Sequence, residues 1–65
     1  MTDAERNNLI KAEMGKSGEF KRSLARKLNL SRPTLDKKLN GNSAWTIKEL
    51  ECLAKIYGKD RTYFF

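Results

Sequence analysis

The chain has 65 residues, of which 38% are hydrophobic and 34% charged, a balance typical of one small globular domain rather than of a disordered segment. With one cysteine and no histidine, it excludes an internal disulfide, a zinc finger with histidine ligands and a histidine-based catalytic site. No apolar run is long enough for a membrane-spanning helix or a signal peptide, so we expect a reduced, cytoplasmic protein that is not an enzyme and uses no metal or cofactor.

The positive charge is concentrated in the middle of the chain. Fourteen Lys and Arg against eight Asp and Glu give a net charge of +6. Residues 1–15 sum to −1 and residues 42–65 to +1, so residues 16–41 carry the whole excess. Such a segment attracts polyanions such as DNA, RNA or an acidic membrane surface. A solvated basic face that keeps the protein soluble explains the charge alone equally well.

The first half of the chain predicts two helices, and the absence of valine argues against a sheet. Thr2 and Glu5 have the spacing of a capping box, which predicts a first helix that ends at Gly15. Apolar periodicity predicts a second helix over residues 20–28. The apolar stripe expected to be buried consists of Phe20, Leu24 and Leu28.

The second half predicts two more helices and a final helical turn. Ser31 is a good N-cap for a third helix that runs to about Leu39. Thr46 opens a second capping box, and the fourth helix that follows is expected to stop at Gly58. Its apolar face consists of Ile47, Leu50, Leu53, Ala54 and Tyr57. With a short last turn over residues 61–65, the prediction is an all-α protein, a compact bundle of four to five short helices.

Residues 21–40 fit the stereochemistry of a helix-turn-helix. Ala25 is small enough for the position where the two helices cross. Asn29 is one of the few residues other than glycine that tolerates the positive φ that the turn needs. Leu35 anchors the second helix of the unit in the core. The spacing therefore places this motif within the basic part of the chain.

The run from Ser23 to Gly41, SLARKLNLSRPTLDKKLNG, resembles the helix-turn-helix of the Cro and CI-type phage repressors, the lambda-repressor-like family. The order of the helices is similar along nearly the whole chain. The resemblance implies a single DNA-binding domain over residues 1–65, with its helix-turn-helix unit at about residues 21–40. It implies a sequence-specific repressor that occupies an operator in double-stranded DNA, in the cytoplasm of a bacterial host cell.

The same resemblance implies which side chains contact DNA. The third helix enters the major groove, with base readers at Arg32, Pro33 and Lys37 and with Thr34 at the edge of the reading face. Arginine and lysine pair with O6 and N7 of guanine, whereas proline offers only apolar contact, for example to a thymine methyl group. Contacts to phosphates are implied for Lys21, Arg22, Ser31 and Asn40.

A set of apolar residues outside the predicted core suggests a homodimer surface, because these domains work in pairs on two half-sites. On the fourth helix, two of them lie opposite or beside its apolar face, and the others end the chain. The set consists of Cys52, Ile56, Tyr63, Phe64 and Phe65. The alternative is that the aromatic residues fold back onto the core of a domain this small.

A second function remains open on the sequence alone: an antirepressor that keeps the same fold and binds another repressor protein. Pro33 in the reading face and Lys38 at a usually apolar position of the motif favour it, while the charge of residues 16–41 favours DNA. RNA binding has little support, since no exposed aromatic platform is predicted. The residues fit a complete 65-residue product and the N-terminal domain of a longer repressor equally well.

Overall fold

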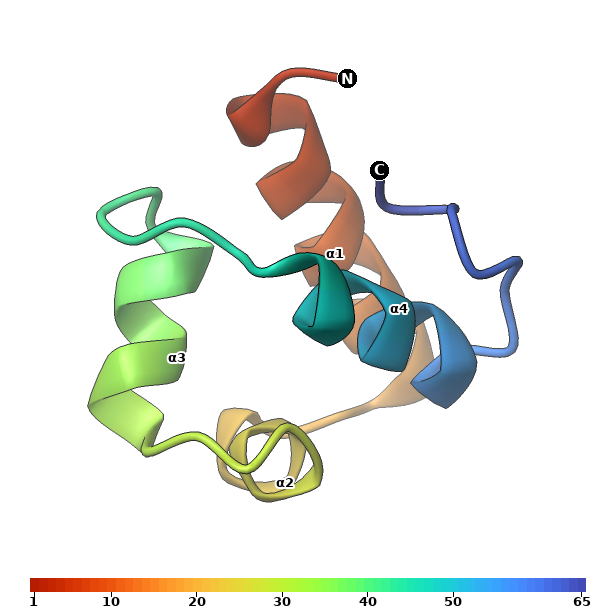
Figure 1. The fold of residues 1–65 in the computed structure, drawn as a ribbon. Helices are drawn as coiled ribbons and strands as arrows, with labels where there is room; N and C mark the ends of the chain where they lie inside the picture. The colour runs from red at the N-terminus through yellow and green to blue at the C-terminus, as the bar shows by residue number, and fades with distance from the viewer.

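In the computed structural model, which describes all 65 residues, every regular element is an α-helix (Figure 1). The four helices are α1 (Asp3–Ser17), α2 (Lys21–Lys27), α3 (Arg32–Leu39) and α4 (Ile47–Ile56). Their packing gives a molecule of 25 × 23 × 20 Å. The predicted all-α class is confirmed, with four helices. None of these helices combines the length and the apolar character that crossing a membrane requires.

Side-chain caps fix the starts of three helices, as the sequence predicts. The hydroxyl of Thr2 accepts a hydrogen bond from the backbone amide of Glu5 at 3.1 Å, and the side chain of Glu5 accepts one from the backbone amide of Thr2. Thr46 forms the same capping box with Glu49 at the start of α4. Ser31 caps α3 through the amide of Thr34 at 3.3 Å. Each cap satisfies backbone donors that have no partner within their helix.

The predicted end of the first helix at Gly15 is wrong, because α1 continues through it to Ser17. Gly15 lies on an open face where no atom would contact an added Cβ, so the glycine weakens the helix but does not end it. Gly18 ends it instead, in the left-handed conformation with φ 69°. Its amide donates back to the carbonyl of Gly15 at 3.4 Å, which satisfies one of the last carbonyls of the helix.

The predicted burial of Phe20 is also wrong. Phe20 is the N-cap residue of α2, its backbone is extended, and its side chain is 75% exposed. The helix begins one residue later, so the ring does not continue the stripe of Leu24 and Leu28, both of which are buried. At the start of α4, Ile47 likewise lies outside the core, whereas the next turns of its predicted face are buried.

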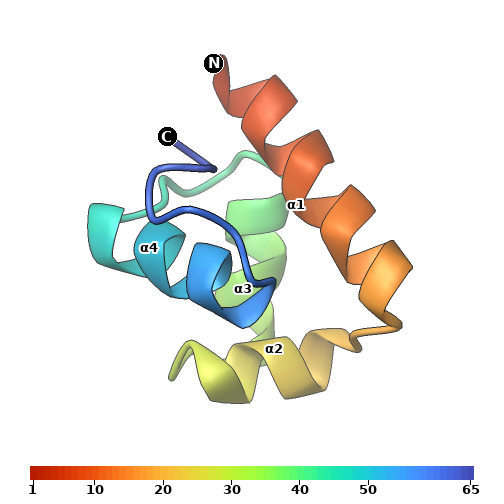
Figure 2. The ribbon, with the colours of Figure 1, turned by 90° about the vertical axis from the view of Figure 1, so that its right-hand side faces the viewer.

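The core lies where the four helices meet, and α3 packs against both α1 and α2 (Figure 2). Figure 2 shows α2 across the base of the molecule, below α3 and α4. The eleven buried apolar residues are Ile10, Met14, Leu24, Ala25, Leu28, Leu35, Leu39, Leu50, Leu53, Ala54 and Phe64. Every helix contributes to this set, which explains how so short a chain holds four helices together.

The C-terminal residues form turns rather than the predicted helical turn, and they return to the start of α1 (Figure 1). Phe64 is completely buried, with its ring edge-on to those of Tyr57 and Tyr63. Nε of Arg6 donates to the carbonyl oxygen of Phe64 at 2.7 Å. The prediction that Phe64 belongs to a homodimer surface is therefore wrong.

The rest of the predicted homodimer surface does not form an exposed apolar patch. Cys52, Ile56 and Tyr63 are half-buried and pack against the core. Phe65 is exposed by 39%. The apolar side of α4 thus belongs to the core of this domain, and the C-terminal aromatic residues complete that core.

Candidate nucleic-acid interface

The turn between α2 and α3 has the backbone that the helix-turn-helix requires. Asn29 has φ 59° and is the one residue other than glycine with a positive φ. The amide of Leu30 donates to the carbonyl of Ala25 at 2.8 Å, which closes the end of α2. Leu35 is completely buried, so α3 is anchored as predicted. The two helices are joined by four residues and stand as a helix-turn-helix unit.

The outward face of α3 carries the predicted base readers. Arg32, Pro33 and Lys37 are exposed, and Thr34 is half-buried at the edge of the face. Asn40, just after the helix, is exposed one turn beyond Lys37. Because residues three or four positions apart lie on the same side of a helix, Pro33, Lys37 and Asn40 form one line along α3.

Half of the fourteen basic side chains form an ion pair within the protein, and the other half do not. The seven ion-paired cations are Arg6, Lys16, Lys21, Lys27, Lys38, Lys59 and Arg61. The seven without a carboxylate partner are all exposed: Lys11, Arg22, Arg26, Arg32, Lys37, Lys48 and Lys55. Four of these seven belong to α2 and α3. The helix-turn-helix unit therefore presents most of the basic charge that the protein leaves uncompensated.

Two of the residues predicted to bind phosphates have partners within the protein. Nζ of Lys21 lies 3.0 Å from Oδ1 of Asp36, so this ammonium is partly neutralised by α3. The hydroxyl of Ser31 donates to Oγ1 of Thr34 at 2.7 Å while it accepts the capping bond. Ser31 thus acts as a cap and keeps no proton for a phosphate. Arg22 is exposed and has no ion-pair partner.

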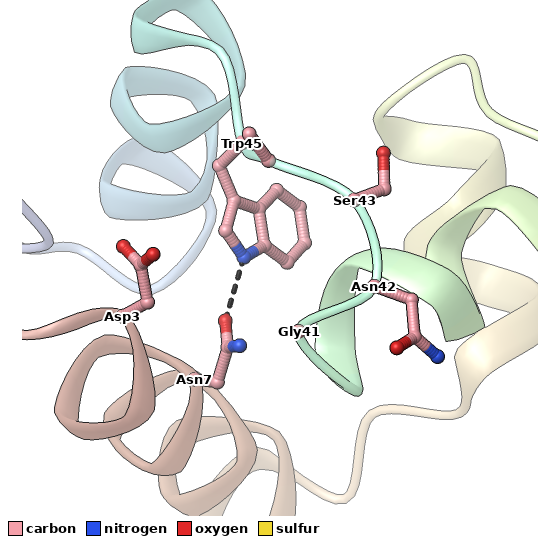
Figure 3. Close-up of a pocket in the computed structure, with 7 residues that line it drawn as sticks. Asp3, Asn7, Gly41, Asn42, Ser43 and Trp45 are labelled. Atoms are coloured by element: carbon pink, nitrogen blue, oxygen red, sulfur yellow. Dashed lines mark hydrogen bonds between the residues drawn. The ribbon is translucent and has the colours of Figure 1, made fainter.

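Behind α3, a polar cluster whose contacts were not predicted from the sequence fixes the following loop. Nζ of Lys38 donates to the carbonyl oxygen of Ala44 at 2.8 Å and pairs with Glu49. The indole Nε1 of Trp45 donates to Oδ1 of Asn7 at 2.7 Å (Figure 3). One signal was available: Lys38 shares the inward stripe of α3 with Leu35 and Leu39, so helical periodicity alone predicts its burial.

The small pocket drawn in Figure 3 lies between α1 and the loop after α3. Its volume is about 160 Å³, and Trp45 and Asn7 contribute to its wall. Asp3 is the one charged residue of the lining, and its carboxylate would repel a phosphate. The pocket therefore does not extend the basic surface of α2 and α3.

The fold and this surface define the class: a small all-helical domain built around a helix-turn-helix. The model of the BetR domain family matches residues 4–65, nearly the whole chain. The chain belongs to the BetR domain family. No curated protein and no solved structure matches it.

Proposed function

We propose that this protein binds double-stranded DNA in a sequence-specific manner and regulates transcription, with α3 in the major groove of an operator. The observation that carries the proposal is the set of exposed basic side chains without an ion-pair partner on α2 and α3. Leaving four cations unpaired on two short adjacent helices favours association with a polyanion, because binding releases the counterions condensed on DNA.

Base readout is assigned to the outward face of α3. Arg32 stands at the first position of the helix and Lys37 five residues further, and both are exposed. Side chains of this kind donate to O6 and N7 of guanine. Pro33, between them on the exposed face, contributes apolar contact. Oγ1 of Thr34 accepts a hydrogen bond from Ser31, and its own hydroxyl proton remains available for donation at the edge of the face.

Phosphate binding is assigned to Arg22 at the start of α2 and to Asn40 at the end of α3. The side chain of Asn40 makes no hydrogen bond within the protein and is exposed. Lys21 joins this set only when its ion pair with Asp36 opens. Contacts at both ends of the unit would fix the orientation of α3 in the groove, whereas base contacts would set the sequence.

The proposed function is the one that the resemblance to the Cro and CI-type repressors implies. We extend this proposal to the mode of binding. One helix in one groove buries little surface, so we propose that two copies occupy two half-sites of an operator. The site of action is the cytoplasm of a bacterial cell. Phe64 belongs to the core, so we do not include it in the surface proposed to join the two copies.

The test is a selection of bound duplexes from a random double-stranded library at about physiological salt. Three proteins are compared: the natural chain, the double variant Arg32→Ala/Lys37→Ala, and the double variant Lys11→Ala/Lys55→Ala. Both variants remove two exposed, unpaired cations, but Lys11 and Lys55 lie on α1 and α4. Because both variants lose the same charge, a difference between them separates base readout by α3 from general electrostatic attraction to DNA.

We expect a palindromic motif for the natural chain and for Lys11→Ala/Lys55→Ala, and no motif for Arg32→Ala/Lys37→Ala. The spacing of the half-sites would then report the dimer geometry. Recovery of no motif from the natural chain, with only weak salt-sensitive binding, would contradict the proposal. In that case the antirepressor function would be preferred, and the partner to seek would be another repressor.

A further inference from the structure

Phe20 is the most exposed of the large apolar side chains, at 75%, and nothing in the fold accounts for it. It makes no side-chain capping bond at the start of α2, where a small polar residue would stabilise the helix more. The core is complete without it. An apolar ring held in water beside a helix start points to a contact made outside this chain.

Several cationic side chains line the surface next to the Phe20 ring. One surface hollow is lined by Phe20 together with Lys21, Arg22, Arg32 and one acid, Glu19, and a second by Phe20 with Arg22 and Arg26. The three arginines have no ion-pair partner. The nearest acid along the chain, Glu19, is engaged by Lys27 at 3.2 Å and does not compensate them.

We infer that Phe20 packs against the deoxyribose rings of a DNA strand whose phosphates are bound by Arg22 and Arg26. The inference rests on the proposed function and adds to it an apolar contact to the backbone. A DNA strand alternates phosphates with sugars that expose carbon atoms, and protein contacts to both are common. An exposed ring that shares one hollow with Arg22 and Arg26 places an apolar group beside two cations, which matches this alternation.

The same features fit a membrane surface less well. Binding in a lipid interface relies on several apolar side chains along one face of a helix, opposite a basic face. Around Phe20 the two hollows contain one other apolar residue, Met14, and that side chain is buried in the core. One exposed ring among several cations therefore favours a nucleic acid backbone over a bilayer.

The experiment measures affinity for a labelled pool of random-sequence duplexes of about 30 base pairs, between about 50 and 200 mM salt. Because sugar contacts are independent of sequence, this probe needs no knowledge of the operator. The variants are Phe20→Ala, Phe20→Leu, Arg22→Ala and Phe65→Ala. Phe65 is the matched control: an exposed phenylalanine at the C-terminus, at the end of the molecule opposite α2 (Figure 1).

Phe20→Ala is expected to weaken duplex binding by about fivefold at every salt concentration, because the lost contact is apolar. Phe20→Leu should retain most of the affinity, and Phe65→Ala all of it. Arg22→Ala should instead lower the slope of log affinity against log salt by about one. Thermal unfolding of Phe20→Ala should match the natural chain, since the ring is not part of the core.

Unchanged duplex binding by Phe20→Ala, or a loss equal to that of Phe65→Ala, would overturn the inference while the proposed function stands. Failure of the natural chain to bind any duplex at low salt would overturn both. A parallel sedimentation assay uses phosphatidylserine vesicles. Loss of vesicle binding in Phe20→Ala without loss of duplex binding would assign the surface to a membrane and overturn the inference.

Discussion

Nζ of Lys38 lies 3.0 Å from Oε1 of Glu49, and this ion pair joins α3 to α4. The two side chains are only 9% and 15% exposed. The same carboxylate oxygen accepts a hydrogen bond from the backbone amide of Thr46 at 2.8 Å, so Glu49 both caps α4 and neutralises Lys38. The Lys38 ammonium also lies 5.8 Å from the centre of the Trp45 ring. The inner side of α3 is therefore held by a polar cluster as well as by leucines.

Breaking this pair from one side should destabilise the fold. Glu49→Ala leaves the ammonium of Lys38 buried without its counter-charge and removes a cap, and we expect a loss of about 2–3 kcal/mol in the free energy of unfolding. Glu49→Gln should lose less, because the amide oxygen still caps α4. The double variant Lys38→Met/Glu49→Gln should approach the natural chain. Urea unfolding checks the order, and a Glu49→Ala variant as stable as the natural chain would contradict it.

The pair also predicts a dependence of stability on pH. Burial raises the pKa of the Glu49 carboxyl, but the hydrogen bond from Thr46 and the contact with Lys38 outweigh it, so that pKa lies below the ordinary 4.5. A folded-state pKa below the unfolded one adds stability above pH 4.5 that is lost as the pH falls through the folded value. Thermal unfolding of Glu49→Gln from neutral pH to about pH 3 should therefore decline less steeply than that of the natural chain.

Part of the loss of stability in acid should persist in Glu49→Gln. Hydrogen bonds with Thr2 lower the pKa of Glu5, and hydrogen bonds with Thr62 lower the pKa of Asp60. Both carboxylates therefore lose stabilising contacts in the same pH range. Equal acid profiles for Glu49→Gln and the natural chain would show that these two exposed groups account for the whole effect and that the buried pair does not.

Asn29 predicts an order of stabilities at the turn. With φ at 59°, an alanine at this position would adopt a conformation that costs about 1 kcal/mol, since it has a Cβ and no polar group to compensate. Asn29→Gly should equal the natural chain, because relief of the backbone is offset by the greater freedom of the unfolded state. Guanidinium unfolding of both variants tests this. An alanine variant as stable as the glycine variant would contradict the prediction.

Features that depend on neighbouring residues could be predicted from the sequence. The caps at Thr2, Ser31 and Thr46, the positive φ of Asn29 and the outward face of α3 all follow from signals within a few positions of each other. Such signals act through the local backbone, whose hydrogen bonds and sterics are the same in any fold. The helix-turn-helix could be predicted from the sequence for the same reason.

Features that depend on distant residues could not. Asn7 and Trp45 are 38 positions apart, and their hydrogen bond exists only after α1 packs against the loop beyond α3. The sequence pattern places Phe64 outside the core. Its burial depends on the packing of the C-terminal segment, whose Phe64 carbonyl oxygen accepts a hydrogen bond from Arg6, 58 positions away. The exposure of Phe20 does not follow from the sequence pattern, because a shift of one residue at the start of α2 moves its ring off the buried stripe.

Tyr57 predicts a loss of stability in alkali. Burial, and then the nearby charges of Glu19 and Glu13, raise the pKa of Tyr57 from 10.0 to about 12. Between these values the folded protein keeps a phenolic proton that the unfolded chain releases, so stability falls as the pH rises above 10. Guanidinium unfolding at about pH 8 and about pH 11 should show a smaller fall for Tyr57→Phe than for the natural chain. Parallel falls would contradict the prediction, since loss of lysine charge is common to both proteins.

Phe64 and Phe65 are adjacent phenylalanines with opposite surroundings, and they predict opposite responses to truncation. Phe64 is completely buried, with ring centroids of Tyr63 and Tyr57 at 5.0 and 6.4 Å, whereas Phe65 is 39% exposed. Phe64→Ala should cost about 3–4 kcal/mol, a large part of the stability of a domain this small. Phe65→Ala should change the free energy of unfolding by no more than about 0.5 kcal/mol.

Thermal unfolding followed by circular dichroism compares the two variants directly. If Phe64→Ala proves too unstable to fold, Phe64→Leu keeps most of the buried volume and should lose about 1–1.5 kcal/mol. Arg6→Ala should weaken the same segment from the other side, since it removes the hydrogen bond to the Phe64 carbonyl. Equal stability of Phe64→Ala and Phe65→Ala would mean that the C-terminal aromatic residues leave the core in solution. They would then again be available as a surface between two copies of the chain.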